Sequence, residues 1–357
     1  MRDRCPPPVE LLQELPGLDF LLPEELIARY PPERRDGGRL LRVLPDSLED
    51  LRITDLPSLL REGDLVVLND TRVLPARLFA RRGSGAQVEA LLVPSPDPDG
   101  PCLALLRPGR RLWVGERLQV LGGGEIHLEE RREDGSWRVQ VHPSPSEVMS
   151  RSGQVPLPPY LGRPAEEADR ERYQTVYAGP AGAVAAPTAG LHLSHELLAS
   201  LEARGIGRVQ ITLHVGPGTF RPLRVEDLRA GRLHAEAYEI GAEAVARIEA
   251  TRAAGGRVLA VGTTAVRALE GAVDAEGRLQ AGRGWTDLLL RPGSRFRVVD
   301  RLLTNFHLPQ SSLLALVHAF AGSPRAQAAY AHALAGRYRF YSYGDAMLLD
   351  LDPPRGE

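Results

Sequence analysis

Residues 257–270 read RVLAVGTTAVRALE, an apolar run followed at once by a helical pattern. The run ends at Gly262, and the helix is predicted to begin at Thr263. A strand that passes directly into a helix is typical of a parallel or mixed sheet with helices packed on it. The hydroxyls of Thr263 and Thr264 and free backbone N–H groups lie at the predicted helix start, where they suit an anion or a ligand carboxylate. Arg267 follows one turn later and is expected to reinforce this site. A capped structural helix is the alternative interpretation.

The same alternation of strands and helices extends on both sides of this stretch. Helical patterns cover residues 195–205 and 242–256, and β-type runs cover residues 207–215 and 234–240. No dinucleotide-binding GxGxxG pattern follows any of these strands, so a Rossmann-type nucleotide site is not indicated.

A different pattern interrupts this alternation. Between residues 71 and 152, short β-type runs are separated by turn signals such as GSG, RPGRR and GGG. Strands of this length and spacing predict a small antiparallel barrel. We therefore expect an α/β fold with a mixed-sheet main domain formed by residues 1–70 and 153–357. An antiparallel β-barrel domain, residues 71–152, would be inserted into it.

The basic residues are unusual, because all 44 of them are arginine and the sequence contains no lysine. A Walker phosphate loop and Schiff-base chemistry both need a lysine, so both are excluded. The formal net charge is −2, and nucleic-acid binding would therefore need a local basic patch. Two interpretations remain open for the arginines of the β-rich segment. They are either scattered charges exposed to solvent or a surface that binds RNA phosphates. They fall in two groups: Arg72, Arg77, Arg81 and Arg82, then Arg107, Arg110, Arg111 and Arg117.

The cysteines and the apolar runs exclude further classes. Cys5 and Cys102 are too few for a disulfide framework, a four-cysteine zinc site or a three-cysteine iron–sulfur cluster. Residues 1–15 have no apolar signal core, and no apolar run reaches the roughly 18 residues of a membrane span. We expect a cytoplasmic protein with no membrane partner.

Polar, glycine-bearing segments follow several of the predicted strands. Residues 186–192 (APTAGLH) and 213–220 (LHVGPGTF) each combine a histidine with glycines that allow a ligand to approach the backbone closely. Plain structural turns are the alternative. The residues that we expect to contact substrate are Asn69, Asp70, Thr71, Arg72, Arg77, Thr188, Gly190, Gly216, Gly218, Thr219, Glu236, Thr263, Thr264, Arg267, Asn305, Tyr343 and Asp345.

Three other functions compete as explanations of these segments. A metal-dependent hydrolase could be assembled from histidines such as His192 and His214 with Glu236, but no compact HExxH signature is present and no metal is expected. A non-catalytic RNA-binding module would leave the polar strand ends unexplained. A conventional methyltransferase would need a glycine-rich turn after its first strand, which is missing.

Taken together, the polar segments closely resemble one family, the S-adenosylmethionine:tRNA ribosyltransferase-isomerases of the queuosine pathway. The resemblance runs from about residue 18 to residue 349, and this chain departs from the usual pattern at Leu193 and Pro217. It is carried by LVVLNDTRVLPARL (65–78), AAPTAGLHL (185–193), LHVGPGTFRP (213–222), AVGTTAVRALE (260–270) and TNFHLPQSSLLALVHAFAG (304–322).

The resemblance implies an activity, its partners and the roles of some residues. The ribosyl group of S-adenosylmethionine would be transferred to, and isomerised on, the 7-aminomethyl-7-deazaguanine (preQ1) of a tRNA wobble position, giving epoxyqueuosine with release of adenine and methionine. S-adenosylmethionine would be consumed as a co-substrate, with no resident cofactor, and we expect a monomer. The sulfonium acidifies the adjacent ribose 5′ carbon, so a base is needed. Histidine suits that role, and the candidates are His192, His214 and His307.

Overall fold

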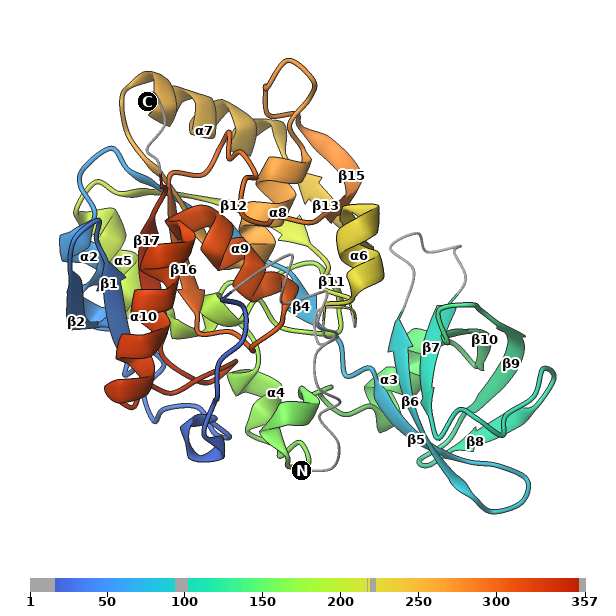
Figure 1. Cartoon of the computed structure of the whole chain (residues 1–357). Coiled ribbons are helices and arrows are strands. Elements are labelled where there is room, and N and C mark those ends of the chain that lie inside the picture. Colours follow the sequence, from blue (N-terminus) through green and yellow to red (C-terminus); the bar gives the residue numbers. More distant parts are fainter. Residues whose placement is uncertain (1–16, 94–101, 217, 219–222, 353–357) are drawn as a thin grey trace.

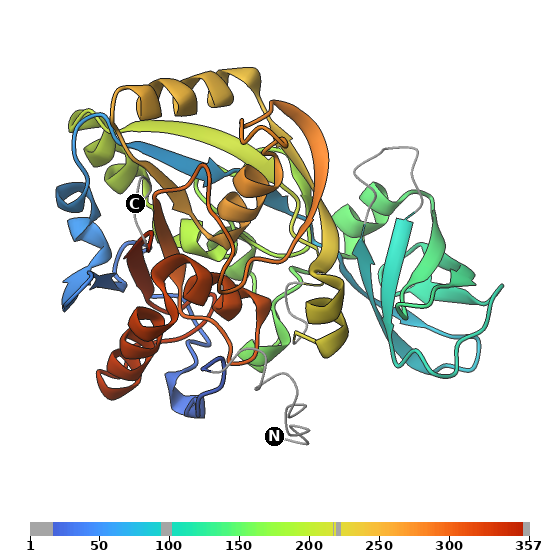
Figure 2. The ribbon, with the colours of Figure 1, turned by 45° about the horizontal axis from the view of Figure 1, so that its top comes forward.

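A computed structural model describes residues 17–93, 102–216, 218 and 223–352. Figure 1 shows a large body with a central sheet and, beside it, a separate small barrel. Figure 2 shows the same two bodies after a 45° turn, with the barrel still projecting from one side.

The main body is built on a nine-stranded mixed sheet. Its neighbours β12–β3, β3–β14, β14–β16 and β17–β1 pair in parallel, and the remaining pairs are antiparallel. The strand order is β15 (Gly282–Leu288), β13 (Arg232–Ile240), β12 (Gly207–Leu213), β3 (Leu65–Asn69), β14 (Val258–Val261), β16 (Arg301–Asn305), β17 (Ala346–Asp350), β1 (Arg39–Val43) and β2 (Leu48–Arg52).

Helices cover both faces of this sheet. Helices α7, α8, α9 and α10 pack on one face, while α2, α5 and the 3-10 turn η4 pack on the other. Central strand β3 (LVVLN) is therefore buried on both sides, which explains its unbroken apolar run. The α-helices are α2 (Leu56–Leu59), α3 (Pro145–Ser152), α4 (Asp169–Arg172), α5 (His195–Ala203), α6 (Val225–Ala230), α7 (Ala242–Ala253), α8 (Thr263–Gly271), α9 (Ser312–Ala321) and α10 (Ser323–Ala335). The 3-10 turns are η1 (Glu24–Leu26), η2 (Ile53–Asp55), η3 (Pro159–Leu161) and η4 (Thr188–His192).

The small body is a closed antiparallel barrel with its own apolar core. Its entry and exit segments lie side by side, because Arg77 and Gln154 exchange two backbone hydrogen bonds of 3.1 and 2.9 Å. A short parallel pair joins β4 (Arg72–Val73), which precedes the barrel along the chain, to β11 (Ala181–Ala183), which follows it. The barrel order is β10 (Trp137–His142), β7 (Cys102–Arg107), β6 (Gln87–Val93), β5 (Arg77–Arg81), β8 (Arg117–Val120) and β9 (Glu125–Arg131).

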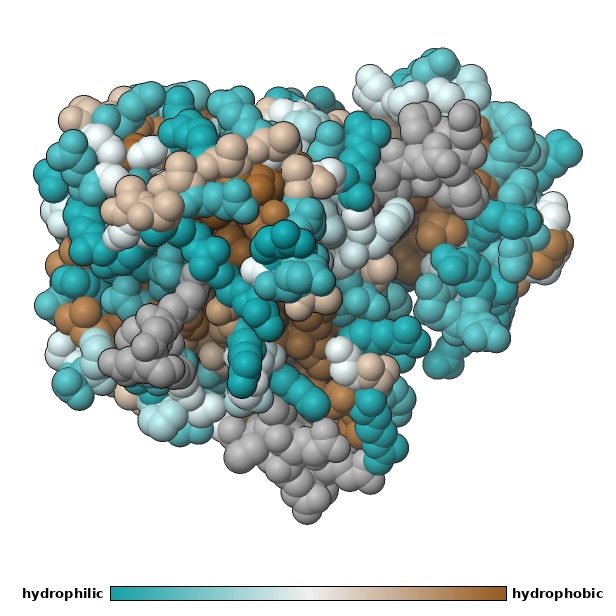
Figure 3. Space-filling model, turned by 90° about the horizontal axis from the view of Figure 1, so that it is seen from above, coloured by the Kyte–Doolittle hydropathy of each residue, from teal (hydrophilic) through white to brown (hydrophobic). Residues whose placement is uncertain are grey.

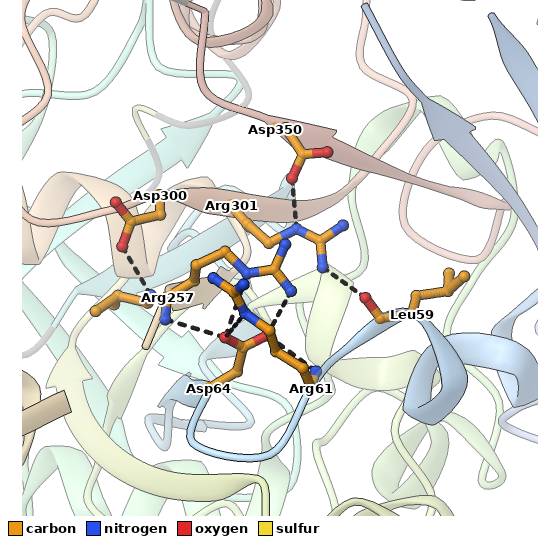
Figure 4. A network of polar contacts seen from close by, with 8 residues as sticks. Leu59, Arg61, Asp64, Arg257, Asp300, Arg301 and Asp350 are labelled. Atoms are coloured by element: carbon orange, nitrogen blue, oxygen red, sulfur yellow. Dashed lines mark hydrogen bonds and ion pairs between the residues drawn. The ribbon is translucent and has the colours of Figure 1, made fainter. Parts of the chain in front are cut away.

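A buried network of charges ties together the amino ends of the parallel strands (Figure 4). Asp64 precedes β3 and accepts hydrogen bonds from Nε (3.2 Å) and Nη2 (2.7 Å) of Arg257, which precedes β14. Burial opposes ionisation of Asp64, but the bonds from Arg257 and from backbone N–H groups outweigh it and hold its pKa below the usual value. Arg301 of β16 is fully buried and donates to Asp350 of β17 at 2.5 Å. Ion pairs therefore fix the edge of the sheet at which strands β3, β14 and β16 begin. The polar residues considered below lie at the opposite edge, where these strands end.

The predicted fold class is confirmed: a mixed-sheet α/β body carries an antiparallel barrel. Within the described ranges, no helix has both the length and the apolar character needed to cross a bilayer.

Candidate active site

The polar strand ends meet at the carboxyl edge of the sheet. Strands β12, β3, β14 and β16 run parallel, so the residues that follow them gather at one edge. Asn69 ends β3, His214 follows β12, Thr263 opens the helix after β14, and Asn305 ends β16. Residues from distant parts of the chain are thus brought into one region.

Asn69 fastens three of these segments together. Its Nδ2 donates to the carbonyl oxygen of Leu213 (3.0 Å) and to Oγ1 of Thr264 (3.2 Å). Its Oδ1 accepts from the backbone N–H groups of Leu213 (2.9 Å) and Thr71 (3.2 Å). Both polar atoms of the amide are therefore engaged within the protein, and Asn69 ties together the segments that follow β3, β12 and β14.

His214 is held by one ring nitrogen. Its Nδ1 lies 2.8 Å from Oγ1 of Thr71, and Gly182 of β11 packs so closely that a Cβ there would lie 2.6 Å from Nδ1. Nε2 has no hydrogen-bond partner among the residues that the structure describes. Burial lowers the pKa of His214, although Glu239 opposes the shift. The ring is therefore mainly neutral at pH 7 and fixed in orientation. In the tautomer whose Nδ1–H donates to Thr71 Oγ1, Nε2 is the nitrogen that can accept a proton.

His192 belongs to a closed network instead. Asn305 Nδ2 donates to the carbonyl oxygen of Tyr341 (3.2 Å), which fixes the orientation of its amide. The same Nδ2 lies 3.1 Å from Nε2 of His192, so Nε2 must accept, and Asn305 Oδ1 accepts from Thr188 Oγ1 at 3.0 Å. Burial, and to a lesser extent Arg339, lowers the pKa of His192 to about 4. His192 lines neither of the two cavities described below, so its imidazole shapes the loop.

A small cavity of about 60 Å³ lies over the ends of β14 and β16. His307 and Thr263 line it together with Tyr160 and Ser342. Nε2 of His307 is 2.8 Å from Oγ1 of Thr304, and burial lowers the pKa of His307 to about 3. Thr263 is 5% exposed, and none of the described residues provides a hydrogen-bond partner for its hydroxyl.

A much larger cleft of about 950 Å³ separates the sheet from the barrel. One wall carries His214, Glu236 and Trp285 of the sheet, and the other carries outward-facing barrel residues such as Leu91 and Arg107. Figure 3 shows the recess between the two bodies, with apolar side chains in it. The cleft adjoins the small cavity, because Val215 and Leu313 line both. A ligand in the cleft could therefore reach His214 and extend a polar end toward Thr263.

Two comparisons with known proteins decide the family. A model of the queuosine biosynthesis protein family matches residues 15–349. This chain belongs to that family. An S-adenosylmethionine:tRNA ribosyltransferase-isomerase of Dechloromonas aromatica is 49% identical over 336 residues, which cover 93% of this chain and 95% of the relative. The enzyme of that name from Acidiphilium cryptum is 50% identical over 343 residues, covering 94% and 99%.

A solved structure of this family is also similar. The crystal structure of S-adenosylmethionine tRNA ribosyltransferase from Thermotoga maritima shares 34% sequence identity with a TM-score of 0.53. The match covers 93% of this chain and 99% of that chain.

In this member of the queuosine biosynthesis family, Arg267 is already paired. Its guanidinium lies in a buried ion pair with Glu236, and its other N–H groups face the carbonyl oxygens of Thr286 (3.4 Å) and Leu288 (3.3 Å). Glu236 also accepts from the backbone N–H of Gly216 at 2.9 Å. Arg267 borders the large cleft, away from the small cavity lined by Thr263 and Thr264. The structure thus separates the arginine from the hydroxyls that we expected it to reinforce.

Residues at the junction with the barrel have partners of their own. Asp70 accepts from Oγ1 of Thr212 at 2.7 Å, and burial raises its pKa. Arg72 donates to two backbone carbonyls of the neighbouring loop. Arg77 lines the cleft but forms an ion pair of 3.1 Å with Glu89. These groups hold the segments that enter and leave the barrel.

Two residues that we expected to contact substrate lie away from both cavities. Tyr343 is buried, and its hydroxyl donates to Asp169 at 2.8 Å. Asp345 accepts the backbone N–H groups of Arg39 (2.9 Å) and Arg339 (2.7 Å). Neither lines the cleft or the small cavity among the described residues. Their neighbour Ser342 lines the cavity instead, which the sequence pattern did not indicate.

The glycines differ in what they allow. A Cβ at Gly190 would lie 2.2 Å from the hydroxyl of Tyr177, so this glycine serves close packing. Gly216 and Gly218 line the large cleft, and a Cβ at Gly218 would lie 3.1 Å from the ring of His234. Thr219 lies outside the described residues.

Among the described residues, no three histidine, cysteine, aspartate or glutamate side chains gather in a group that could hold a metal ion. His214 and Glu236 both line the cleft, but His192 lies apart from them in its network with Asn305. The metal-hydrolase alternative therefore has no geometric support in this part of the chain.

Proposed function

We propose that this chain transfers the ribosyl group of S-adenosylmethionine to preQ1 at the wobble position of a tRNA and isomerises it, giving epoxyqueuosine. Adenine and methionine are released. The observation that carries the proposal is the cleft of about 950 Å³ with a neutral, fixed His214 on its wall, in a chain whose family is established over nearly its full length. An anticodon loop is single-stranded, so its base can leave the stack at small cost and enter such a cleft.

We assign the base to His214. The positive sulfonium makes the adjacent ribose 5′ C–H acidic, and a neutral imidazole can remove that proton. Thr71 holds Nδ1 of His214, which directs Nε2 away from the hydroxyl. His307 lines the small cavity and has a pKa near 3, and His192 is enclosed, so both are weaker candidates for the base.

We assign the small cavity to the amino-acid end of S-adenosylmethionine. Thr263 supplies a hydroxyl, and the first backbone N–H groups of α8 point out of the helix start and favour a carboxylate. The remainder of the co-substrate would then extend past Val215 toward His214. S-adenosylmethionine is consumed in this scheme, and no resident cofactor takes part. A tRNA substrate supports a cytoplasmic location, and one chain supplies both walls of the cleft, which supports a monomer.

The direct test of the function is release of adenine. Wild-type protein incubated with S-adenosylmethionine and preQ1-modified tRNA is expected to release one adenine per epoxyqueuosine formed, measured by chromatography and mass spectrometry of the digested tRNA. The matched control is the same tRNA with guanine at the wobble position, which has no aminomethyl group and should yield no adenine. Transfer of a methyl group to the tRNA without release of adenine would contradict the proposal.

Arg110→Ala is expected to weaken tRNA binding and to make its salt dependence shallower, by roughly one unit of slope for one lost phosphate contact. Arg110 is exposed on the barrel and has no ion pair with the described residues. Arg77→Ala is expected to change the slope less, because Arg77 is already paired with Glu89. Binding of labelled tRNA at several salt concentrations measures both. Equal slopes for Arg110→Ala and wild type would contradict the assignment.

A further inference from the structure

Trp285 is an exposed aromatic residue on the wall of the cleft. It lies on the edge strand β15 and its side chain is 62% exposed, which is unusual for the largest apolar residue. The next residue, Thr286, is buried, as expected where successive side chains of a strand point to opposite faces. The indole therefore stands on the cleft face and leaves a flat apolar surface open to a ligand.

The register of three strands puts this indole in one row with His214. Ala237 of β13 pairs with Trp285 of β15, and the backbone N–H of His214 donates to the carbonyl oxygen of Ala237 at 2.9 Å. Residues directly opposite on antiparallel strands share a face. Two strand spacings of about 4.8 Å put the backbones of His214 and Trp285 roughly 10 Å apart. The small side chain of Ala237 between them leaves room for a planar ring.

The opposite wall suits the same kind of ligand. Leu91 pairs with Leu105 and Val93 pairs with Leu103 on β6 and β7, and all four face outward from the barrel into the cleft. Arg107 also lines this wall and has no ion pair with the described residues. Two apolar walls with an adjacent unpaired guanidinium fit an unstacked nucleobase that is attached to a phosphate backbone.

We propose that Trp285 is the stacking platform for the target purine of the tRNA, holding the preQ1 ring over Ala237 and beside His214. This inference rests on the proposed function and names the residue that positions its RNA substrate. Stacking on an indole recognises the flat face of the base, so it adds affinity for RNA without contributing to the binding of S-adenosylmethionine.

The fluorescence of Trp285 provides the first test. A preQ1-containing anticodon stem-loop is titrated into wild type, Trp285→Phe and Trp113→Phe. Trp113 is also exposed, at 59%, but does not line the cleft, so it is the matched control. Binding is expected to quench tryptophan emission in wild type and in Trp113→Phe, and the quench should disappear in Trp285→Phe while affinity stays within about threefold. A quench that persists in Trp285→Phe overturns the proposal.

The second test separates stacking from the function itself. Trp285→Ala is expected to raise the KM for tRNA by roughly 10- to 100-fold, with the KM for S-adenosylmethionine unchanged. An unchanged KM for tRNA, or a change of oligomeric mass that shows Trp285 to be a subunit contact, overturns the stacking role. If wild type itself releases no adenine with preQ1-modified tRNA, the proposed function fails instead. The Phe variant, which keeps the ring, distinguishes a lost stack from a misfolded strand.

Discussion

His214→Ala is expected to slow adenine release by about 10²- to 10⁴-fold in single-turnover experiments, the usual contribution of a general base. The reason is geometric, since His214 is the candidate histidine on the wall of the large cleft, and Nδ1 is held by Thr71 at 2.8 Å. Affinities for both substrates should change little, because the imidazole acts on the reacting carbon. Binding of S-adenosylmethionine and tRNA is measured separately to confirm this.

His195→Ala is the matched control, because it removes an exposed imidazole at the start of α5 and should leave the rate unchanged. Thr71→Val tests how the base is held, and loss of one hydrogen bond to the ring is expected to slow the reaction about tenfold. If His214→Ala reacts at the wild-type rate, the base must be another group, and His307 is examined next.

The pH dependence of the wild-type rate should also show that His214 acts as the base. Burial lowers the pKa of His214 below its usual value of 6.5, so the neutral form that accepts the proton predominates at pH 7. The single-turnover rate is therefore expected to be flat near neutrality and to fall only as the pH drops through that lowered pKa. An acid limb centred above pH 6.5 would contradict the assignment.

Several parts of the site could be predicted because they depend on strand ends. The pattern at residues 257–270 placed a strand before a helix, and similar patterns placed His214 and Asn305 after apolar runs. Parallel strands bring their carboxyl ends to one edge whatever their order, so the gathering of these residues needed no knowledge of which strands are neighbours. The barrel could be predicted for a similar reason, since short runs separated by turns have few other solutions.

Other parts depend on pairing between distant residues, which the pattern of one chain does not reveal. Arg267 follows Thr263 by one helical turn, yet its guanidinium pairs with Glu236 on another strand. Tyr343 was expected to contact substrate, but its hydroxyl donates to Asp169, which lies 174 residues away along the chain. Trp285 lies in one row with Ala237 and His214 only because of the register between β13 and β15. The sequence pattern therefore did not indicate that this tryptophan lies near the candidate base.

Glu236→Ala is expected to lower the free energy of unfolding by about 3–5 kcal/mol, because it leaves the guanidinium of Arg267 buried without a carboxylate. Both residues are 5% exposed, and their ion pair joins β13 to α8. Urea denaturation monitored by circular dichroism measures the loss. Glu239→Ala is the matched control on the same strand, since its 3.0 Å pair with Arg283 is exposed and should contribute within about 1 kcal/mol.

The double variant Glu236→Leu/Arg267→Met is expected to recover most of that loss, because removing both charges leaves no unpaired ion in the interior. It also decides between two roles for Arg267. If the guanidinium serves only the ion pair, the folded double variant should keep its KM for S-adenosylmethionine within about threefold of wild type. Loss of even one hydrogen bond between the guanidinium and the co-substrate would raise the KM by more than threefold. A stable double variant with a KM raised tenfold or more would instead mean that Arg267 leaves Glu236 to bind the co-substrate carboxylate. Glu236 would then be the partner of Arg267 only while no co-substrate is bound.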